Sequence, residues 1–307
     1  MSNPFTPHTN AGFPSAGPVV GRIGERREGP DHRAPAVFVS HGSPLAVMDE
    51  DFKQALRRFG AQTRPPKHLV VVSAHWQGPR PVRVTASARP ETMRDFEGFP
   101  SWLSTFNYRC PGDPLLAQRI VDMLNAVGVK SAVDPSRGLD SASWGPLSIM
   151  YPSAKVPVVQ VSLPAPVTPE EMLTIGRTLG LLRREGSLLL GSGGLVHNLS
   201  RVSFDMRAPS TEGWAMAFDN WMRERIESLD IDTLCQYRTR APMAHLAAPT
   251  SEHLDPLFFA LGARLPGDTV SWLTEGFHGG NLSLRSFALA GRRPEDQRLP
   301  PDLTFGP

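Results

Sequence analysis

The sequence predicts a single α/β domain with a central, mostly parallel or mixed sheet flanked by helices. Three observations favour this fold class. Short apolar runs alternate along the chain with amphipathic stretches of helical period. Proline stands where several of these stretches begin and glycine where they end, as at Pro114 and Gly128. The chain has 307 residues, which is enough for one large domain with a buried core.

The apolar runs are too short for helices and are typical of strands that are buried on both faces of a sheet. The clearest are AVFVS at Ala36–Ser40 and LVVVS at Leu69–Ser73. Further strands are expected at Pro81–Ala86, Val156–Leu163, Ser187–Leu190, Thr269–Thr274 and Leu282–Leu289.

The amphipathic stretches between the strands predict helices that cover the sheet. They are Asp51–Phe59, Pro114–Val127, Pro169–Arg184, Thr211–Ser228 and Ser251–Leu261. Arg183 and Arg184, at the end of the third stretch, are expected on a solvated face.

The two ends of the chain have a different composition from its middle. Residues 1–36 are rich in Pro and Gly without sustained periodicity, and they predict a disordered leader. The Pro-containing segment 291–307 predicts a flexible tail. We therefore expect one catalytic domain over about residues 37–290, without an internal repeat or linker.

Charge and hydropathy exclude several classes of partner. Lys and Arg number 32 against 30 Asp and Glu, so no basic excess is available to bind nucleic acid. No apolar stretch approaches the roughly 18 residues of a membrane span. The two cysteines, Cys110 and Cys235, exclude a disulfide framework or a thiolate zinc site and favour a cytoplasmic location. The oligomeric state is not readable from the sequence.

Three histidines follow the predicted ends of three strands. His41 comes after Ala36–Ser40, His75 after Leu69–Ser73, and His197 after a Gly-rich turn that begins at Gly191. Ligands bind in the crevice outside the carboxyl ends of the strands of such sheets. One histidine of this kind is more often a hydrogen-bonded loop residue, but three at one rim favour a shared site.

A fourth histidine, His253, falls in the first turn of a predicted helix, where the helix dipole favours a neutral ring. An imidazole-rich site without thiolates suits Zn, Fe(II), Cu or Ni. His197 could complete the coordination sphere or act as a base, because a neutral imidazole serves in both roles. His278, beside Gly279 and Gly280, could reach the site, although a plain turn residue is the simpler interpretation.

Two other motifs carry little support. The GSGG segment at 191–194 lacks the spacing of a dinucleotide fingerprint and the Lys of a P-loop. Ser192 does not stand in a nucleophile elbow of the G-x-S-x-G form, so a serine hydrolase is not indicated.

Seven segments, in the same order along residues 36–290, resemble the class III extradiol ring-cleavage dioxygenases, and among them the 4,5-DOPA extradiol branch. They are HGSP at 41–44, SAHW at 73–76, GLDSASWGPLSIMYP at 138–152, PVVQVSL at 157–163, GSGGLVHNL at 191–199, SEHLDPLFFALGA at 251–263 and EGFHGGNLSLRSF at 275–287.

The resemblance implies a single α/β domain with a non-haem metal centre, Fe(II) for activity and Zn(II) in its place in some members. By motif, His41, His75 and His253 would be the metal ligands, and His197 the acid/base residue or a fourth ligand. The reaction implied is insertion of O2 into a small aromatic substrate, a catechol or related ortho-substituted phenol, with ring cleavage.

Two positions depart from the family pattern. Ser141 stands where the family usually has a histidine before the motif's Gly and Trp, and a hydroxyl cannot hold a charge near neutral pH. Before the last strand, Gly279 and Gly280, preceded by His278, replace the family's usual Tyr-Gly. We therefore consider His278 as a partial replacement for the missing imidazole. The departure leaves two alternatives open. One is a hydrolase or a non-ring-cleaving oxidative enzyme on the same centre, and the other is a catalytically impaired metal-binding homologue.

Overall fold

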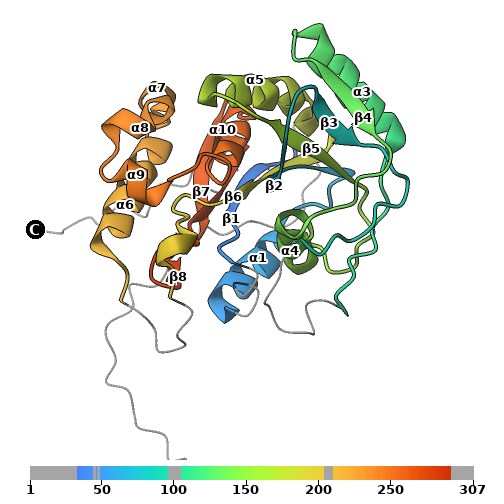
Figure 1. Ribbon diagram of the computed structural model, residues 1–307. Coiled ribbons are helices and arrows are strands. Elements are labelled where there is room, and N and C mark those ends of the chain that lie inside the picture. The colour runs from blue at the N-terminus through green and yellow to red at the C-terminus, as the bar shows by residue number, and fades with distance from the viewer. Residues whose placement is uncertain (1–32, 44–45, 47–48, 96–104, 204–209, 292–307) are drawn as a thin grey trace, which may run out of the picture.

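A mixed sheet of eight strands, in the order β4-β3-β5-β2-β6-β1-β10-β7, runs through the middle of the part of the chain that the structure describes (Figure 1). The structure is a computed structural model that describes residues 33–43, 46, 49–95, 105–203 and 210–291. The strands of this sheet are β1 (Ala36–Ser40), β2 (His68–Gly78), β3 (Val82–Thr85), β4 (Ser131–Asp134), β5 (Val158–Pro164), β6 (Ser187–Gly193), β7 (Asp268–Thr274) and β10 (Ser286–Gly291). A separate pair is formed by β8 (Phe277–His278) and β9 (Leu282–Ser283).

Most of the strand pairs at the centre of the sheet are parallel. β6 is parallel to both of its neighbours, β1 and β2, and β2 is also parallel to β5. Toward one edge, β10 is antiparallel to β1 and to β7. Toward the other edge, β3 meets β5 antiparallel and β4 parallel. The predicted α/β fold with a mostly parallel or mixed sheet is therefore confirmed.

Helices cover both faces of the sheet (Figure 1). They are α1 (Glu50–Gln62), α3 (Pro114–Ala126), α4 (Ser141–Met150), α5 (Pro169–Gly180), α6 (Gly213–Glu227), α7 (Ile231–Cys235), α8 (Tyr237–Arg240), α9 (Ala244–Ala247) and α10 (Asp255–Gly262), with 3-10 turns η2 (Leu181–Glu185) and η3 (Leu199–Arg201). In β1, Ala36 and Phe38 face one hydrophobic cluster and Val37 and Val39 the other. This alternation explains why the strand is apolar at every position.

Several predicted boundaries differ from the observed ones. Strand β2 continues past Ser73 to Gly78, so His75 lies within the strand, beside a register shift between Val72 and Gln77. Helix α10 begins at Asp255, so His253 lies in the turn before the helix and not in its first turn. The region predicted as one strand, Leu282–Leu289, is divided between β9 and β10.

The prediction that Arg183 lies on a solvated face is wrong, because its side chain is fully buried. Its guanidinium donates to the carbonyl oxygens of Ala34, Ala263 and Leu289 at 2.7–2.9 Å and forms an ion pair with Asp268 at 2.5 Å. Five donors in a planar fork allow one arginine to satisfy several acceptors at once. The neighbouring Arg184 is exposed, as predicted.

The predicted leader and tail fall mostly on residues 1–32 and 292–307, which lie outside the described residues. Ala34 and Ala36, at the end of the predicted leader, already belong to the fold: Ala34 is hydrogen-bonded to the Arg183 carbonyl and Ala36 begins β1. Among the described helices, none has the length and apolar character needed to cross a bilayer.

Candidate metal centre

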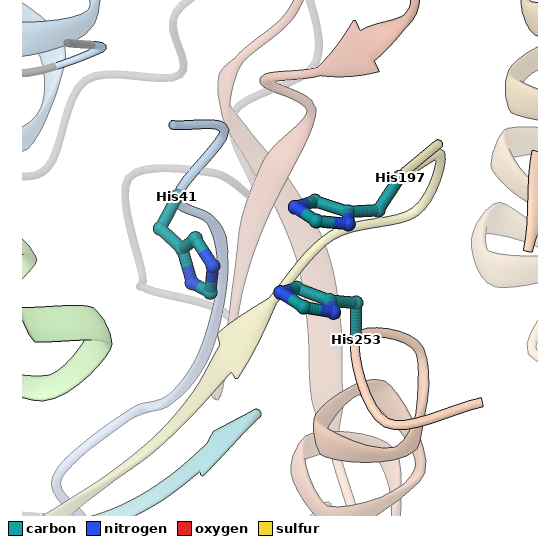
Figure 2. Close-up of side chains that lie close together, drawn as sticks. All are labelled: His41, His197 and His253. Carbon is teal, nitrogen blue, oxygen red and sulfur yellow. The ribbon is translucent and has the colours of Figure 1, made fainter. Parts of the chain in front are cut away.

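Four histidines meet beyond one end of the central strands. His41 directly follows β1, His75 lies near the end of β2, His197 follows β6, and His253 precedes α10. One ring nitrogen from each of His41, His197 and His253 lies within 4.8 Å of the others (Figure 2). The ring of His75 adjoins this group, with its centroid 5.2 Å from that of His41 and 5.7 Å from that of His253.

Glycines in β6 allow the turn that carries His253 to approach the sheet. A Cβ on Gly193 would lie 2.1 Å from the carbonyl oxygen of His253, and one on Gly191 would lie 2.1 Å from that of Pro256. The N–H of Gly194 donates to the His253 carbonyl at 2.7 Å, and that of His41 to the Gly193 carbonyl at 2.9 Å. The backbone itself therefore joins His41 and His253 through the end of β6.

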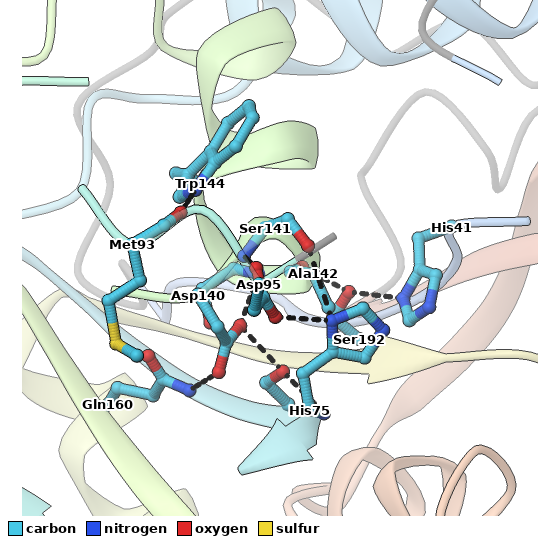
Figure 3. Close-up of polar contacts among 12 residues, drawn as sticks. His41, His75, Met93, Asp95, Asp140, Ser141, Ala142, Trp144, Gln160 and Ser192 are labelled. Atoms are coloured by element: carbon cyan, nitrogen blue, oxygen red, sulfur yellow. Dashed lines mark hydrogen bonds and ion pairs between the residues drawn. The ribbon is translucent and has the colours of Figure 1, made fainter. Parts of the chain in front are cut away.

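The ring of His41 is oriented by a chain of contacts that starts in α4 (Figure 3). Pro146, within this helix, has no N–H to donate to the carbonyl of Ala142, four residues earlier. That carbonyl instead accepts the Ser192 hydroxyl at 2.5 Å, and the Ser192 oxygen lies 3.0 Å from His41 Nδ1. Because the single hydroxyl proton is used on Ala142, Nδ1 of His41 must be the donor, which leaves a lone pair on Nε2.

His75 is held through both its ring and its backbone. Its Nδ1 lies 2.7 Å from Asp95 Oδ2 and 3.2 Å from Ser141 Oγ (Figure 3). Its backbone N–H donates to Ser73 Oγ at 3.0 Å, and that hydroxyl donates to the buried Asp140 at 2.8 Å.

His253 and His197 are stacked on one another, with ring centroids 3.5 Å apart and planes 6° from parallel. Nδ1 of His253 lies 3.2 Å from Glu252 Oε1. The backbone N–H of His197 donates to the Ala247 carbonyl at 2.9 Å, and no ring hydrogen bond of His197 is found among the described residues. His197 thus differs from the other three histidines, each of which has a polar partner at Nδ1.

Burial keeps three of the rings neutral. It lowers the pKa of His41 and His253, and it lowers the pKa of His197 to about 3, with the neighbouring imidazoles adding to the effect. For His75, burial also acts to lower the pKa, but the hydrogen bond to Asp95 and the charges of Asp140 and Asp95 outweigh it, so the pKa is raised.

The donor set fits a divalent transition-metal ion. The Nε2 atoms of His41 and His253 are buried and have no hydrogen-bond partner among the described residues. Two unpartnered imidazole nitrogens, aimed into one space from rings that are anchored on their other side, are typical of metal ligands. Neutral imidazoles with no thiolate suit Zn(II) or Fe(II).

The other two predicted site residues lie in different surroundings. Ser141 is the first residue of α4, and its N–H donates to Asp95 Oδ1 at 2.8 Å beside His75. His278 lies in β8, half-buried, and burial lowers its pKa against an opposing effect of Asp49. Among the described residues, the group of ring nitrogens that lie within 4.8 Å of one another does not include His278.

Sequence reasoning missed three residues that orient the rings, namely Asp95, Ser192 and Glu252. Glu252 is the chain neighbour of His253, which is a local signal, whereas nothing in the sequence near Ser192 marks it as a partner of His41. Asp95 lies 20 positions from His75 in the chain, and no local pattern marks it.

The chain resembles known proteins in both sequence and fold. Residues 32–283 match the family model described as the catalytic LigB subunit of aromatic ring-opening dioxygenase. A protein of Beta vulgaris named 4,5-DOPA dioxygenase extradiol is 36% identical over 257 residues, which cover 81% of this chain and 94% of the relative. A protein of the same name from Escherichia coli K12 is 36% identical, with 83% and 94% of the two chains covered.

A solved structure shares the fold. The crystal structure of an uncharacterized protein from Escherichia coli K12 superposes with a TM-score of 0.71 at 31% sequence identity, covering 84% of this chain and 100% of that one. The predicted resemblance to extradiol dioxygenases is thereby confirmed. By the family model and by its named relatives, the chain is a dioxygenase homologue, and it belongs to the family of the catalytic LigB subunit of aromatic ring-opening dioxygenases.

Proposed function

We propose that the protein is a non-haem Fe(II)-dependent extradiol dioxygenase that cleaves the ring of a catechol or a related ortho-substituted phenol. In the net reaction both atoms of O2 enter the product and one ring carbon–carbon bond beside the hydroxyls breaks. The observation that carries the proposal is the pair of buried, unpartnered Nε2 atoms of His41 and His253 beside two further imidazoles. The relatives named 4,5-DOPA dioxygenase extradiol suggest a catechol with an amino-acid side chain as the first substrate to try.

We assign His41, His75 and His253 as the metal ligands. In each of these rings Nδ1 has a polar partner, Ser192, Asp95 or Glu252, which leaves Nε2 for the ion. By the distances between ring nitrogens alone, His197, and not His75, would join His41 and His253. The anchoring favours His75, because a ligand whose other nitrogen is hydrogen-bonded has a fixed orientation and tautomer.

His197 remains as the acid/base residue, or as a fourth ligand when Zn(II) is bound. Its ring has no hydrogen bond among the described residues, so a ring nitrogen stays available to take a proton from a catechol hydroxyl. Iron(II) held by the three anchored rings would supply the redox centre for the reaction of the catechol with O2. The stacking of His197 on His253 holds the base beside one of the proposed metal ligands.

Ser141 and His278 stay candidates for substrate contact. The hydroxyl of Ser141 can donate or accept a hydrogen bond but cannot take up a proton near neutral pH. The hypothesis that His278 supplies the imidazole absent at Ser141 predicts a lower kcat for His278→Ala, and unchanged kinetics would reject it.

The test is reconstitution of the metal-free protein with Fe(II) under anaerobic conditions, followed by a panel of catechols and ortho-aminophenols. We expect one O2 to be consumed per substrate in an oxygen-electrode assay, with a yellow ring-opened product in the absorption spectrum. His41→Gln is expected to abolish turnover, whereas the matched variant His245→Gln, at an exposed histidine of α9, keeps it.

Two other outcomes would replace the proposal with its alternatives. Turnover without O2 would indicate a hydrolase or another enzyme using a metal-activated water. Stoichiometric metal binding without turnover on any of the substrates would indicate an impaired homologue, for which the Ser141 departure supplies the reason.

A further inference from the structure

Asp95 connects the ring of His75 to the first turn of α4. One carboxylate oxygen, Oδ2, lies 2.7 Å from His75 Nδ1, and the other, Oδ1, accepts the backbone N–H of Ser141 at 2.8 Å (Figure 3). The side chains of Asp95 and His75 are 20% and 24% exposed, so the pair is largely shielded from water. The carboxylate therefore makes two short contacts. One is with a backbone N–H, which can only donate, and the other is with a ring nitrogen, which can donate or accept.

The Ser141 contact fixes the orientation of the Asp95 carboxylate, with Oδ1 toward Ser141 and Oδ2 toward His75. A backbone N–H only donates, and the first N–H groups of a helix have no partner within the helix. The positive end of the α4 dipole also favours a carboxylate at this place. A ring nitrogen and a backbone N–H thus face the two oxygens of Asp95, which are the surroundings that an ionised carboxylate favours.

An ionised carboxylate can only accept, so the proton between Asp95 and His75 belongs to Nδ1 of the imidazole. A neutral imidazole that carries its proton on Nδ1 has its lone pair on Nε2. The His75 backbone is held separately, through Ser73 and Asp140, so Asp95 acts on the ring and not on the path of β2.

We infer that Asp95 is a positioning residue that holds His75 in the tautomer with the proton on Nδ1 and thereby keeps the Nε2 lone pair available to a divalent metal ion. This inference rests on the proposed function, in which His75 is a ligand. Asp95 would thus orient His75 through Nδ1, in the same way as Ser192 orients His41 and Glu252 orients His253.

Two substitutions at Asp95 separate this role from a structural one. In Asp95→Asn the Ser141 N–H must still be met by the amide oxygen, which turns the amide NH2 toward His75 Nδ1. An NH2 group donates, so the substitution favours the tautomer with the proton on Nε2. In that tautomer Nε2 has no lone pair to offer the metal ion. In Asp95→Ala, His75 is free to adopt either tautomer.

The inference predicts a specific order of Zn²⁺ affinities, measured by competition with a chromophoric chelator. Asp95→Asn should weaken binding by about 10–100-fold, and Asp95→Ala should weaken it less. If Asp95 only fastened its segment to α4, the order would be reversed, because the isosteric amide keeps the Ser141 bond and Ala loses it. That reversed order, or an unchanged affinity in Asp95→Asn, would overturn the inference.

The chain offers a matched control in a second histidine–carboxylate pair. His68, at the opposite end of β2, lies 3.2 Å from Asp113, which also caps α3 through the N–H of Leu116. Asparagine caps helices as well as aspartate does, so Asp113→Asn should keep both the thermal unfolding temperature and the Zn²⁺ affinity.

Nitrogen-15 NMR of histidine-labelled, metal-free protein reads the tautomer without any metal. At a pH high enough that the ring shifts no longer change with pH, and the ring is therefore neutral, His75 should show its proton on Nδ1 in the unaltered protein and on Nε2 in Asp95→Asn. The reverse assignment in the unaltered protein would overturn the inference. If the unaltered protein bound no Zn²⁺ while the NMR result held, the proposed function would fail and the role of Asp95 in setting the tautomer would stand.

Discussion

The four imidazoles of the site are not equivalent, and the difference lies in their Nδ1 atoms. His41, His75 and His253 each have a polar partner there, whereas the ring of His197 has none among the described residues. We expect His197→Gln to keep stoichiometric Zn²⁺ binding while kcat with Fe(II) falls by about 10²–10⁴-fold, the usual size of a general-base effect.

His253→Gln is the comparison for that experiment, since it removes an anchored ring from the same stacked pair. This variant should lose the metal as well as turnover. Equal metal loss in both variants would show that His197 is a ligand first, and the assignment of roles would have to be exchanged.

Burial of neutral histidines makes the stability of the metal-free protein depend on pH. The pKa of His197 is about 3 in the folded chain, against its usual value of 6.5, so between these values the unfolded chain binds a proton that the folded chain does not. The contribution of this group to stability is therefore complete above pH 6.5 and is lost as the pH falls toward 3.

Urea unfolding of the metal-free protein across this window measures the effect. The free energy of unfolding should fall less steeply with decreasing pH in His197→Gln than in the unaltered protein, by about 1.4 kcal/mol per pH unit. Parallel pH dependences of the two proteins would mean that His197 titrates normally.

At the scale of residues, the histidines that meet in the site could be predicted from the sequence, and the groups that orient their rings could not. A histidine directly after a buried β-branched run is visible locally, as at His41 and His75. Asp95 and Ser192 act through space, and their partners are fixed only when α4 packs against the ends of β2 and β6.

Among the elements, β6 and the turn before α10 meet too closely for a side chain. A Cβ on Gly193 would lie 2.1 Å from the His253 carbonyl oxygen, whereas the nearest atom to one on Gly194 is 3.5 Å away. We expect Gly193→Ala to cost about 1–3 kcal/mol of stability, as other overpacked sites do, and to weaken Zn²⁺ binding by shifting His253. Gly194→Ala is the control, and a similar loss of affinity in both variants would argue against this explanation.

Arg183 ties η2 to β10, to the loop before β7 and to the segment that leads into β1. Arg183→Met would leave the Asp268 carboxylate buried without its partner, and we expect a loss of about 3–5 kcal/mol in unfolding free energy. Arg184→Met, at the exposed neighbour, should stay within about 0.5 kcal/mol of the unaltered protein. Urea unfolding of the two variants side by side measures the difference, and a small effect at Arg183 would show that the buried pair is dispensable.

Elements with a regular apolar pattern could be predicted, and α4 could not. Its sequence, SASWGPLSIM, contains Gly145 and Pro146, which oppose helix formation. The helix forms because Asp140 caps its first turn and because Ser192 satisfies the carbonyl of Ala142 that Pro146 leaves free. The cap is local, but the Ser192 contact is supplied by tertiary packing, which a local pattern does not contain.

At the scale of the whole molecule, the order of the strands explains why the four histidines meet. β2, β6 and β1 are adjacent and parallel, so their carboxyl ends lie side by side. Helix α10 packs against β6, so the turn before this helix also reaches these strand ends. The fold class followed from the alternation of strands and helices. The strand order did not, because pairing partners far apart in the sequence are selected by the packing of the complete sheet.

The most direct test of the account is an anomalous difference map from crystals of the protein loaded with Zn²⁺. We predict one strong peak at about 2.0–2.1 Å from the Nε2 atoms of His41, His75 and His253, with Asp95 in hydrogen-bond contact with Nδ1 of His75. A peak bound through Nδ1 atoms, a peak that leaves His75 out of the coordination sphere, or the absence of any peak among the four rings would contradict it.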